Sequence, residues 1–252
     1  MKTLIGKWLL LSVSLLLVLS ITSCFPTKER KANNVEGLFN QASTYYQDEK
    51  YKKARETFEE LRDNYPLSKY SIVAELRIAD SYYHAEEYGE AINRYEDFKK
   101  LHPTNPTIPY IIYQIGLSYF KQILSIDQDQ TFTQNAVKQF EHLISKYPST
   151  TYATSAQKEL EICKEKLGQY EFYVGNFYFK REKYASALYR FNGILANFPK
   201  LSINDKVYLY IGESYLSLEE KEKAKTALTH LVENYPNSEH YSKAKKLLAK
   251  LK

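Results

Sequence analysis

Residues 79–103 read ADSYYHAEEYGEAINRYEDFKKLHP, and their spacing predicts two helices packed as a hairpin. The small residue at the start is followed three positions later by a tyrosine. Ala91 is followed at four and seven positions by the bulky Tyr95 and Phe98. Positions i, i+4 and i+7 lie on one face of a helix, so the second segment has an apolar stripe. The closing His-Pro pair ends that helix, because proline lacks the backbone N–H and forces its predecessor out of helical conformation.

The same pattern occurs five times along the chain. Each occurrence ends in an aromatic residue or histidine followed by proline: Tyr65-Pro66, His102-Pro103, Tyr147-Pro148, Phe198-Pro199 and Tyr235-Pro236. Twelve residues before each proline stands an alanine: Ala54, Ala91, Ala136, Ala187 and Ala224. A small residue lies on the first helix of each occurrence: Ala42, Ala79, Gly116, Gly175 and Gly212. One such match could arise by chance, whereas five in phase indicate an internal repeat.

This small-x-x-Tyr…Ala-x-x-x-Phe…Pro pattern resembles the tetratricopeptide repeat (TPR), in which a helix A and a helix B form a hairpin. The resemblance covers about residues 35–236, although the early tryptophan of the motif is absent. One hairpin cannot bury its own apolar face, so hairpins stack on one another. We therefore predict an all-α fold, a TPR-like α-solenoid of five helical hairpins.

The spacing between repeats changes once. Thirteen residues separate a proline from the next small residue in three cases, but twenty-seven separate Pro148 from Gly175. The fourteen added residues continue an apolar pattern at helical spacing, which predicts one long helix with a continuous buried seam. The expected seam consists of Ala153, Ala156, Leu160, Cys163, Leu167, Tyr170, Val174 and Phe177.

This break predicts how the chain is divided. We expect hairpins 1–3 in residues 35–150, the long helix with hairpins 4 and 5 in residues 151–236, and a capping helix in residues 237–252. Three plus two hairpins would then be arranged around one shared helix. The lysine-rich face of the capping helix is interpreted as a solvated end, with an acidic partner or lipid headgroups as the alternative.

The third repeat contains an eight-residue insertion in residues 125–133, SIDQDQTFT. Asp127 and Asp129 resemble the start of a calcium loop, but the glycine that such a loop requires is missing. We interpret the insertion as a solvated loop that is free to contact a partner. No metal site is predicted.

The N-terminus has the pattern of a bacterial export signal. Residues 1–23 combine a basic start with an apolar run and end directly before Cys24, as in the lipobox of bacterial lipoproteins. That resemblance implies a cleaved signal peptide and a Cys24 that carries an N-acyl chain and an S-diacylglycerol. Residues 24–34 would be the lipidated cysteine and a flexible tether. An ordinary signal peptide or an uncleaved anchor, with Cys24 incidental, is the alternative.

Composition and charge exclude several classes of protein. The formal charge is +5; without Lys2 and Lys7 of the signal, 33 basic and 30 acidic residues leave +3, which is too balanced to indicate nucleic-acid binding. Two cysteines cannot provide a disulfide framework, and Cys163 is expected in the core. Neither a nucleophile elbow, nor a zinc-binding H-E-x-x-H, nor a phosphate-binding loop occurs. No catalytic residue, no enzymatic activity and no cofactor are predicted.

The concave surface of TPR folds is lined by helix A residues three before and four after the small residue. All ten such positions are apolar or aromatic: Phe39, Leu76, Tyr113, Phe172, Leu209, Tyr46, Tyr83, Phe120, Phe179 and Leu216. An exposed apolar trough usually marks a binding site. We predict a peptide groove in hairpins 1–3 formed by Phe39, Tyr46, Leu76, Tyr83, His84, Tyr110, Tyr113 and Phe120. Packing of helix A on helix A is the alternative for some of them.

Two further stretches suggest a family. They are His102-Pro103-x-x-Pro106-x-x-x-Tyr110-x-x-Tyr113-x-x-Gly116-Leu117 and Leu167-Gly168-Gln169-Tyr170-Glu171-x-x-Val174. Together with the lipobox and five hairpins, they resemble the BamD (ComL) family of outer-membrane assembly lipoproteins. The resemblance implies a lipid-anchored component of the β-barrel assembly machinery on the periplasmic face of the outer membrane. Another TPR lipoprotein scaffold, for division or peptidoglycan attachment, is the alternative.

The resemblance also implies partners. Hairpins 1–3 would recognise unfolded outer-membrane proteins, and hairpins 4 and 5 would bind the periplasmic domains of a BamA-type barrel protein. The membrane would be contacted through the lipid anchor.

Overall fold

The computed structural model describes residues 34–251, so the predicted signal peptide, Cys24 and most of the tether lie outside the described residues. Within residues 34–251 the regular elements are eleven α-helices and no strand. They are α2 (Val35–Gln47), α3 (Tyr51–Asn64), α4 (Ser71–His84), α5 (Tyr88–Leu101), α6 (Ile108–Phe120), α7 (Thr131–Lys146), α8 (Thr151–Phe179), α9 (Tyr184–Asn197), α10 (Asn204–Ser217), α11 (Lys221–Asn234) and α12 (Tyr241–Ala249). The predicted all-α class is confirmed.

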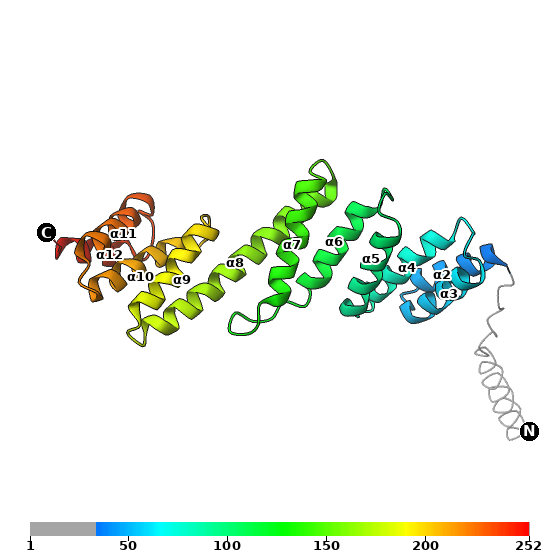
Figure 1. The fold of residues 1–252 in the computed structure, drawn as a ribbon, viewed down its shortest axis with the longest axis horizontal. Helices are drawn as coiled ribbons and strands as arrows, with labels where there is room; N and C mark the ends of the chain where they lie inside the picture. The colour runs from blue at the N-terminus through cyan, green and yellow to red at the C-terminus, as the bar shows by residue number, and fades with distance from the viewer. Residues whose placement is uncertain (1–33, 252) are drawn as a thin grey trace, which may run out of the picture.

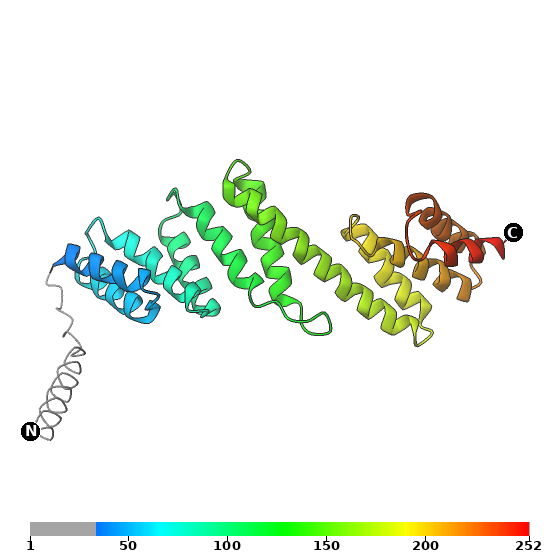
Figure 2. The ribbon, with the colours of Figure 1, turned by 180° about the vertical axis from the view of Figure 1, so that it is seen from behind.

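Successive helices pair into five hairpins that lie side by side in one elongated stack, with the two ends of the described chain at opposite ends of the molecule (Figures 1 and 2). Helix A of each hairpin is α2, α4, α6, α8 or α10, and helix B is α3, α5, α7, α9 or α11. In each hairpin, the alanine of helix B is fully buried. The repeat pattern therefore corresponds to the packing between the two helices.

The small residue of helix A allows helix B to approach closely. A Cβ atom placed on Gly116 would lie 2.5 Å from the ring of Phe140, and one placed on Gly175 would lie 2.5 Å from the ring of Phe191. Real Cβ atoms do not come that close, so the aromatic residue four positions after the alanine fills the space that glycine leaves. Both aromatic rings are completely buried.

Four of the turns between helix A and helix B share an unusual backbone conformation. Glu49, Glu86, Glu182 and Glu219 have φ angles of 59 to 61°. This left-handed conformation ends a helix by allowing the next residue to bond back into it, as Lys50 N–H does to the Tyr45 carbonyl at 2.8 Å. Glycine adopts it with least strain, so a glutamate at each turn costs stability.

The long helix α8 contains 29 residues and is capped at its N-terminus by Thr150, whose hydroxyl accepts the backbone N–H of Ala153. At 1.5 Å per residue it is about 44 Å long. Its first half joins the core cluster of α7 through Leu160 and Cys163, and its second half packs with α9 through Phe172. The described core forms four apolar clusters, and the grouping of hairpins as three plus two stays a prediction.

The predicted seam of α8 is correct in its first half and wrong in its second. Ala153, Ala156, Leu160 and Cys163 are buried as expected. Beyond them the buried positions are Gly168, Phe172 and Gly175, whereas Phe177 is 44% exposed and Leu167, Tyr170 and Val174 are only half-buried. The buried face rotates because the second half packs on α9 rather than α7. A straight helix also drifts from a strict heptad pattern.

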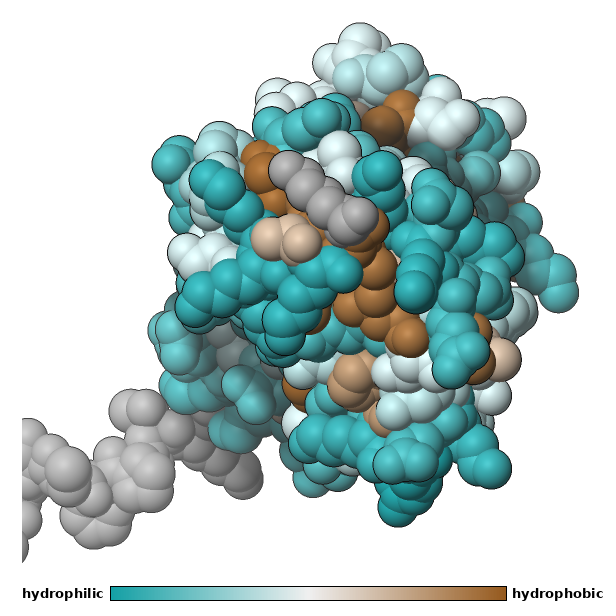
Figure 3. All heavy atoms as spheres, turned by 90° about the vertical axis from the view of Figure 1, so that its left-hand side faces the viewer, coloured by the Kyte–Doolittle hydropathy of each residue, from teal (hydrophilic) through white to brown (hydrophobic). Residues whose placement is uncertain are grey.

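The C-terminal end is capped by α12, which is shorter than the predicted 237–252 because a turn follows Pro236, in which the Ser238 hydroxyl accepts the His240 backbone N–H. Lys243 of α12 pairs with Glu213 of α10 at 2.5 Å. Figure 3, viewed from this end, shows a strip of hydrophobic surface between hydrophilic regions. Leu247 and Leu248 of α12 are half-buried against the last core cluster.

Candidate interaction surfaces

Five aromatic side chains gather where hairpins 1 and 2 turn from helix A to helix B. The His84 ring stacks on Tyr51 at 5.4 Å and meets Tyr46 edge to face at 5.6 Å. Tyr83 lies 5.4 Å from His84 and 5.6 Å from Tyr88. We call these five residues the aromatic cluster. It brings together three predicted groove residues, Tyr46, Tyr83 and His84.

The aromatic cluster combines an apolar surface with neutral polar groups. Burial, and to a lesser degree the nearby Asp80 carboxylate, raises the pKa of Tyr46 to about 12, and burial raises the pKa of Tyr83. Both phenols therefore stay protonated at neutral pH. The Arg77 guanidinium lies 5.3 Å from the centre of the Tyr46 ring, which favours a cation–π contact. His84 is exposed, so the cluster is open to a guest.

Sequence reasoning missed Tyr51 and Tyr88, which belong to helix B. Each follows the groove tyrosine of its own hairpin by five residues, and Phe179 and Tyr184 repeat that spacing in hairpin 4, where their rings lie 5.6 Å apart. This spacing was available in the sequence. Two aromatic residues five positions apart come into contact because the last turn of helix A faces the first turn of helix B.

The other predicted groove residues take part in packing between hairpins. Phe39 stacks on Tyr70 at 4.6 Å, and Tyr113 lies 5.9 Å from Tyr152. Leu76 and Phe120 are half-buried against the central core cluster. Phe172 and Leu209, which lie outside the groove predicted in hairpins 1–3, are buried, with 8% and 2% of their surfaces exposed, so packing accounts for these two of the ten positions.

Tyr110 belongs to a buried hydrogen-bond network rather than to an open surface. Its hydroxyl donates to the Asp80 carboxylate at 2.7 Å, and Tyr95 donates to the same oxygen at 2.7 Å. Arg77 binds the other oxygen of Asp80 at 3.0 Å, and Asp80 itself is 1% exposed. Burial raises the pKa of both phenols. The network joins α4, α5 and α6, so it fixes hairpin 2 against hairpin 3.

A hollow of about 600 Å³ lies between α7 and α9 over the middle of α8. Its lining includes Gln134 of α7, Leu167 and Glu171 of α8, Tyr189 and Arg190 of α9, and Phe198, which directly follows α9. Arg190 and Glu171 form an ion pair at 2.9 Å. The Tyr189 side chain is 77% exposed. We call this hollow the notch.

The notch exists because α8 is long. Its fourteen added residues place α7 and α9 on different halves of the helix, as both ribbon views show (Figures 1 and 2). The sequence therefore contained the signal for a gap between α7 and α9, but sequence reasoning interpreted the extension only as a strut.

Two findings concern chemistry and membranes. In residues 34–251, His, Cys, Asp and Glu side chains form no group of three that could hold a metal ion. None of the described helices is long and apolar enough to cross a membrane. Cys163 is completely buried, and burial raises the pKa of its thiol to about 12.

Known proteins of one family are similar to this chain along most of its length. The family model YfiO, described as outer membrane lipoprotein, matches residues 31–229. The chain is 32% identical over 244 residues to "Outer membrane protein assembly factor BamD" of Rickettsia prowazekii, and the alignment covers 95% of this chain and 96% of that protein. Proteins of the same name from Caulobacter vibrioides and Neisseria gonorrhoeae are each 27% identical; the alignments cover 88% and 92% of this chain and 73% and 92% of those proteins.

Solved structures of TPR proteins also resemble the chain. The structure "TPR2AB-domain:pHSP90-complex of yeast Sti1" is 14% identical with a TM-score of 0.45; the match covers 86% of this chain and 82% of that one. The match of the family model over residues 31–229 decides the assignment. The chain belongs to the YfiO family of outer membrane lipoproteins.

Proposed function

We propose that this chain is an outer membrane protein assembly factor, a component of the machinery that inserts β-barrel proteins. The observation that carries the proposal is the similarity to the Rickettsia prowazekii assembly factor along nearly the whole length of both chains. A stack of helical hairpins with two separate open surfaces suits a scaffold that holds other proteins. The names of the relatives favour this role over a division or peptidoglycan scaffold.

The first test is affinity capture of the lipidated protein from membranes. We expect a BamA-type barrel protein to co-purify, and we expect depletion of the chain to lower many outer membrane barrels together. Normal barrel levels with a division defect would support the other scaffold role instead.

Membrane attachment is proposed to occur through lipid on Cys24, on the periplasmic face of the outer membrane. One acyl chain gives marginal binding, at about 0.8 kcal/mol per buried methylene, whereas two or more anchor stably. Cys24→Ser should release the protein into the soluble periplasmic fraction and abolish labelling with radioactive palmitate. Continued labelling of the Cys24→Ser protein would contradict the assignment.

The aromatic cluster is proposed to hold an extended, aromatic-rich segment of an unfolded outer membrane protein. Burying one large apolar side chain is worth about 1.5 to 3 kcal/mol, but ordering a flexible guest offsets much of this gain. We therefore expect reversible binding, which suits a protein that passes an unfolded outer membrane protein on for insertion. The double variant Tyr46→Ala, Tyr83→Ala should weaken crosslinking to a barrel C-terminal peptide severalfold. Tyr173→Ala, which removes an exposed tyrosine of α8, is the control and should not weaken it.

The notch is proposed to receive the periplasmic domains of the BamA-type partner. It combines an exposed tyrosine and an arginine, two residue types that often dominate the energy of protein interfaces, with apolar Leu167 and Phe198 beside them. Tyr189→Ala should reduce recovery of the partner at least severalfold, while Tyr173→Ala leaves it unchanged. Equal recovery with both variants would remove the notch from the proposal.

A further inference from the structure

Hairpins 2 and 4 have the same pair of charged residues at the same repeat positions. A glutamate stands four residues before the small residue of helix A, as Glu75 or Glu171. An arginine stands three residues after the alanine of helix B, as Arg94 or Arg190. In hairpin 4 the two side chains pair at 2.9 Å.

In hairpin 2 this pair is broken. The Glu75 carboxylate binds His102 Nε2 at 2.7 Å instead, and hairpin 4 has Phe198 at the position of that histidine. Arg94 forms no ion pair with any described residue, and its Nε atom is buried without a hydrogen-bond partner. A buried N–H that has lost its hydration and gained no acceptor is unfavourable. Arg94 therefore lacks the carboxylate that its equivalent in hairpin 4 has.

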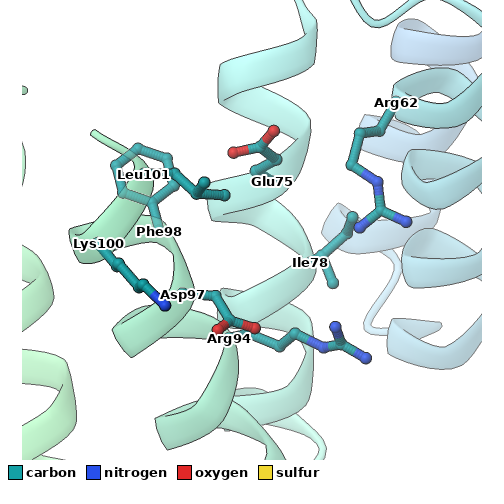
Figure 4. Close-up of a pocket in the computed structure, with 8 residues that line it drawn as sticks. All are labelled: Arg62, Glu75, Ile78, Arg94, Asp97, Phe98, Lys100 and Leu101. Carbon is teal, nitrogen blue, oxygen red and sulfur yellow. The ribbon is translucent and has the colours of Figure 1, made fainter.

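Arg94 lines a hollow of about 340 Å³ between α3, α4 and α5. Figure 4 shows Arg62 and Arg94 extending from different helices toward opposite sides of Ile78, while the Glu75 carboxylate points away from Arg62. The apolar surface is completed by Phe98 and by Leu101, which is 66% exposed. We call this hollow the Arg94 pocket.

Arg94 makes the pocket favourable for an anion, because its Nε–H has no acceptor among the described residues. Its lining has three cationic residues, Arg62, Arg94 and Lys100, against two anionic ones, Glu75 and Asp97, and Glu75 is bound to His102. Arg62 pairs with Asp63, an exposed neighbour on its own helix, at 2.8 Å. Charge-assisted bonds from guanidinium to carboxylate are among the stronger hydrogen bonds in proteins.

We propose that the Arg94 pocket binds an acidic side chain of a partner protein, with an apolar neighbour of that side chain against Ile78 and Leu101. The partner's carboxylate would pair with Arg94 as the Glu171 carboxylate pairs with Arg190 in hairpin 4. This site is separate from the other two surfaces: it lies at the C-terminal ends of α3 and α5, whereas the aromatic cluster lies at their N-terminal ends. The inference goes beyond the proposed function and does not depend on it.

Nuclear magnetic resonance of the mature protein in detergent micelles, labelled with ¹⁵N-arginine, tests the proposal. The chain has seven arginines, so each Nε–H signal can be assigned by an Arg→Lys variant. The probe is the peptide acetyl-Leu-Glu-Leu-amide. We expect it to shift the Arg94 Nε–H signal saturably, with a Kd on the order of millimolar, and to leave the paired Arg190 signal in place. The same peptide with glutamine should bind at least about tenfold more weakly, because its amide carries no charge.

Three outcomes would overturn the proposal. The first is an equal shift with the glutamate and glutamine peptides. The second is tighter binding of acetyl-Leu-Gln-Leu with a free C-terminal carboxylate than of the glutamate peptide. The third is an equal shift with acetate or inorganic phosphate alone, which would indicate a site for small anions. Glu171→Gln provides an internal check, because it removes the carboxylate from Arg190. In that variant the glutamate peptide should also shift the Arg190 signal, and a silent Arg190 would contradict the equivalence of the two hairpins.

Discussion

Hairpins 2 and 4 share a repeat, but the surfaces beside them differ. Next to hairpin 2, α3 and α5 approach each other over the 14-residue α4 and line the Arg94 pocket. Next to hairpin 4, the 29-residue α8 separates α7 from α9 and opens the larger notch. Their interiors differ too, because Ala79-Asp80 in hairpin 2 corresponds to Gly175-Asn176 in hairpin 4. The repeat positions determine the core, while helix length and single substitutions determine what each hairpin presents.

The strongest expected contrast concerns two positions on α8, one buried against the core beside hairpin 3 and one exposed in hairpin 4. Burial raises the pKa of the Cys163 thiol to about 12, from a usual value of 9.0, and only the thiolate reacts with iodoacetamide. At pH 8 we expect alkylation roughly a thousandfold slower than for an exposed thiol, since each pKa unit is a factor of ten. A cysteine introduced by Tyr173→Cys in Cys163→Ala protein is the control, because Tyr173 is 46% exposed on the same helix. Similar rates would show that α7 separates readily from α8.

The same shift predicts a dependence on pH. A thiol whose pKa is raised by folding contributes stability that is complete below the unfolded pKa of about 9 and is lost as the pH rises toward 12. Cys163→Ala should therefore lose less stability than the natural protein between pH 9 and 12 in urea unfolding. Identical losses would contradict the burial of the thiol.

The second contrast concerns the interior of the two hairpins. Asp80→Ala should destabilise the protein by about 3 to 5 kcal/mol, because it leaves Tyr95, Tyr110 and Arg77 without their shared acceptor. Asn176→Ala, at the equivalent position of hairpin 4, should cost far less, because Asn176 Oδ1 is buried without a hydrogen-bond partner. Urea unfolding of both variants measures the difference. Equal costs would show that the network does not distinguish hairpin 2.

The third contrast concerns the small residue of helix A. Gly175→Ala should destabilise by about 1 to 3 kcal/mol, because its Cβ would lie 2.5 Å from Phe191. Gly193→Ala in the same hairpin is the control, since a Cβ there meets nothing within 4 Å. Alanine is the better helix former by about 0.8 to 1 kcal/mol, so the control should stabilise. Stabilisation by both substitutions would show that hairpin 4 accepts the alanine that hairpin 2 has.

The smallest effect is expected to be the same in both hairpins. Glu86→Gly and Glu182→Gly should each stabilise the protein by about 0.5 to 1 kcal/mol, because glycine adopts a positive φ without strain. Thermal unfolding of each variant measures this gain. Opposite effects in the two hairpins would indicate that one turn glutamate has a further contact.

The sequence predicted most of the fold because the repeat positions are sites of close packing. Proline pairs, buried alanines and the small residues opposite Phe140 and Phe191 all act locally, so their spacing alone revealed five hairpins. The rotation of the buried face of α8 depends on which helix packs on each half, and no local pattern records that. The groove prediction brought Tyr46, Tyr83 and His84 together but missed the role of Asp80 as the acceptor of Tyr110. The Arg94 pocket depends on whether Glu75 pairs with His102 or with Arg94, and only the three-dimensional contacts show that it pairs with His102.

Photocrosslinking from two positions in living cells tests the central claim most directly. A benzoylphenylalanine at position 84 samples the aromatic cluster, and one at position 189 samples the notch. We predict that position 84 crosslinks to unfolded outer membrane proteins and that position 189 crosslinks to a BamA-type barrel protein. Neither position should crosslink to the partner of the other. Crosslinks from both positions to the same protein, or to no outer membrane assembly component, would contradict a scaffold that binds different partners at the aromatic cluster and at the notch.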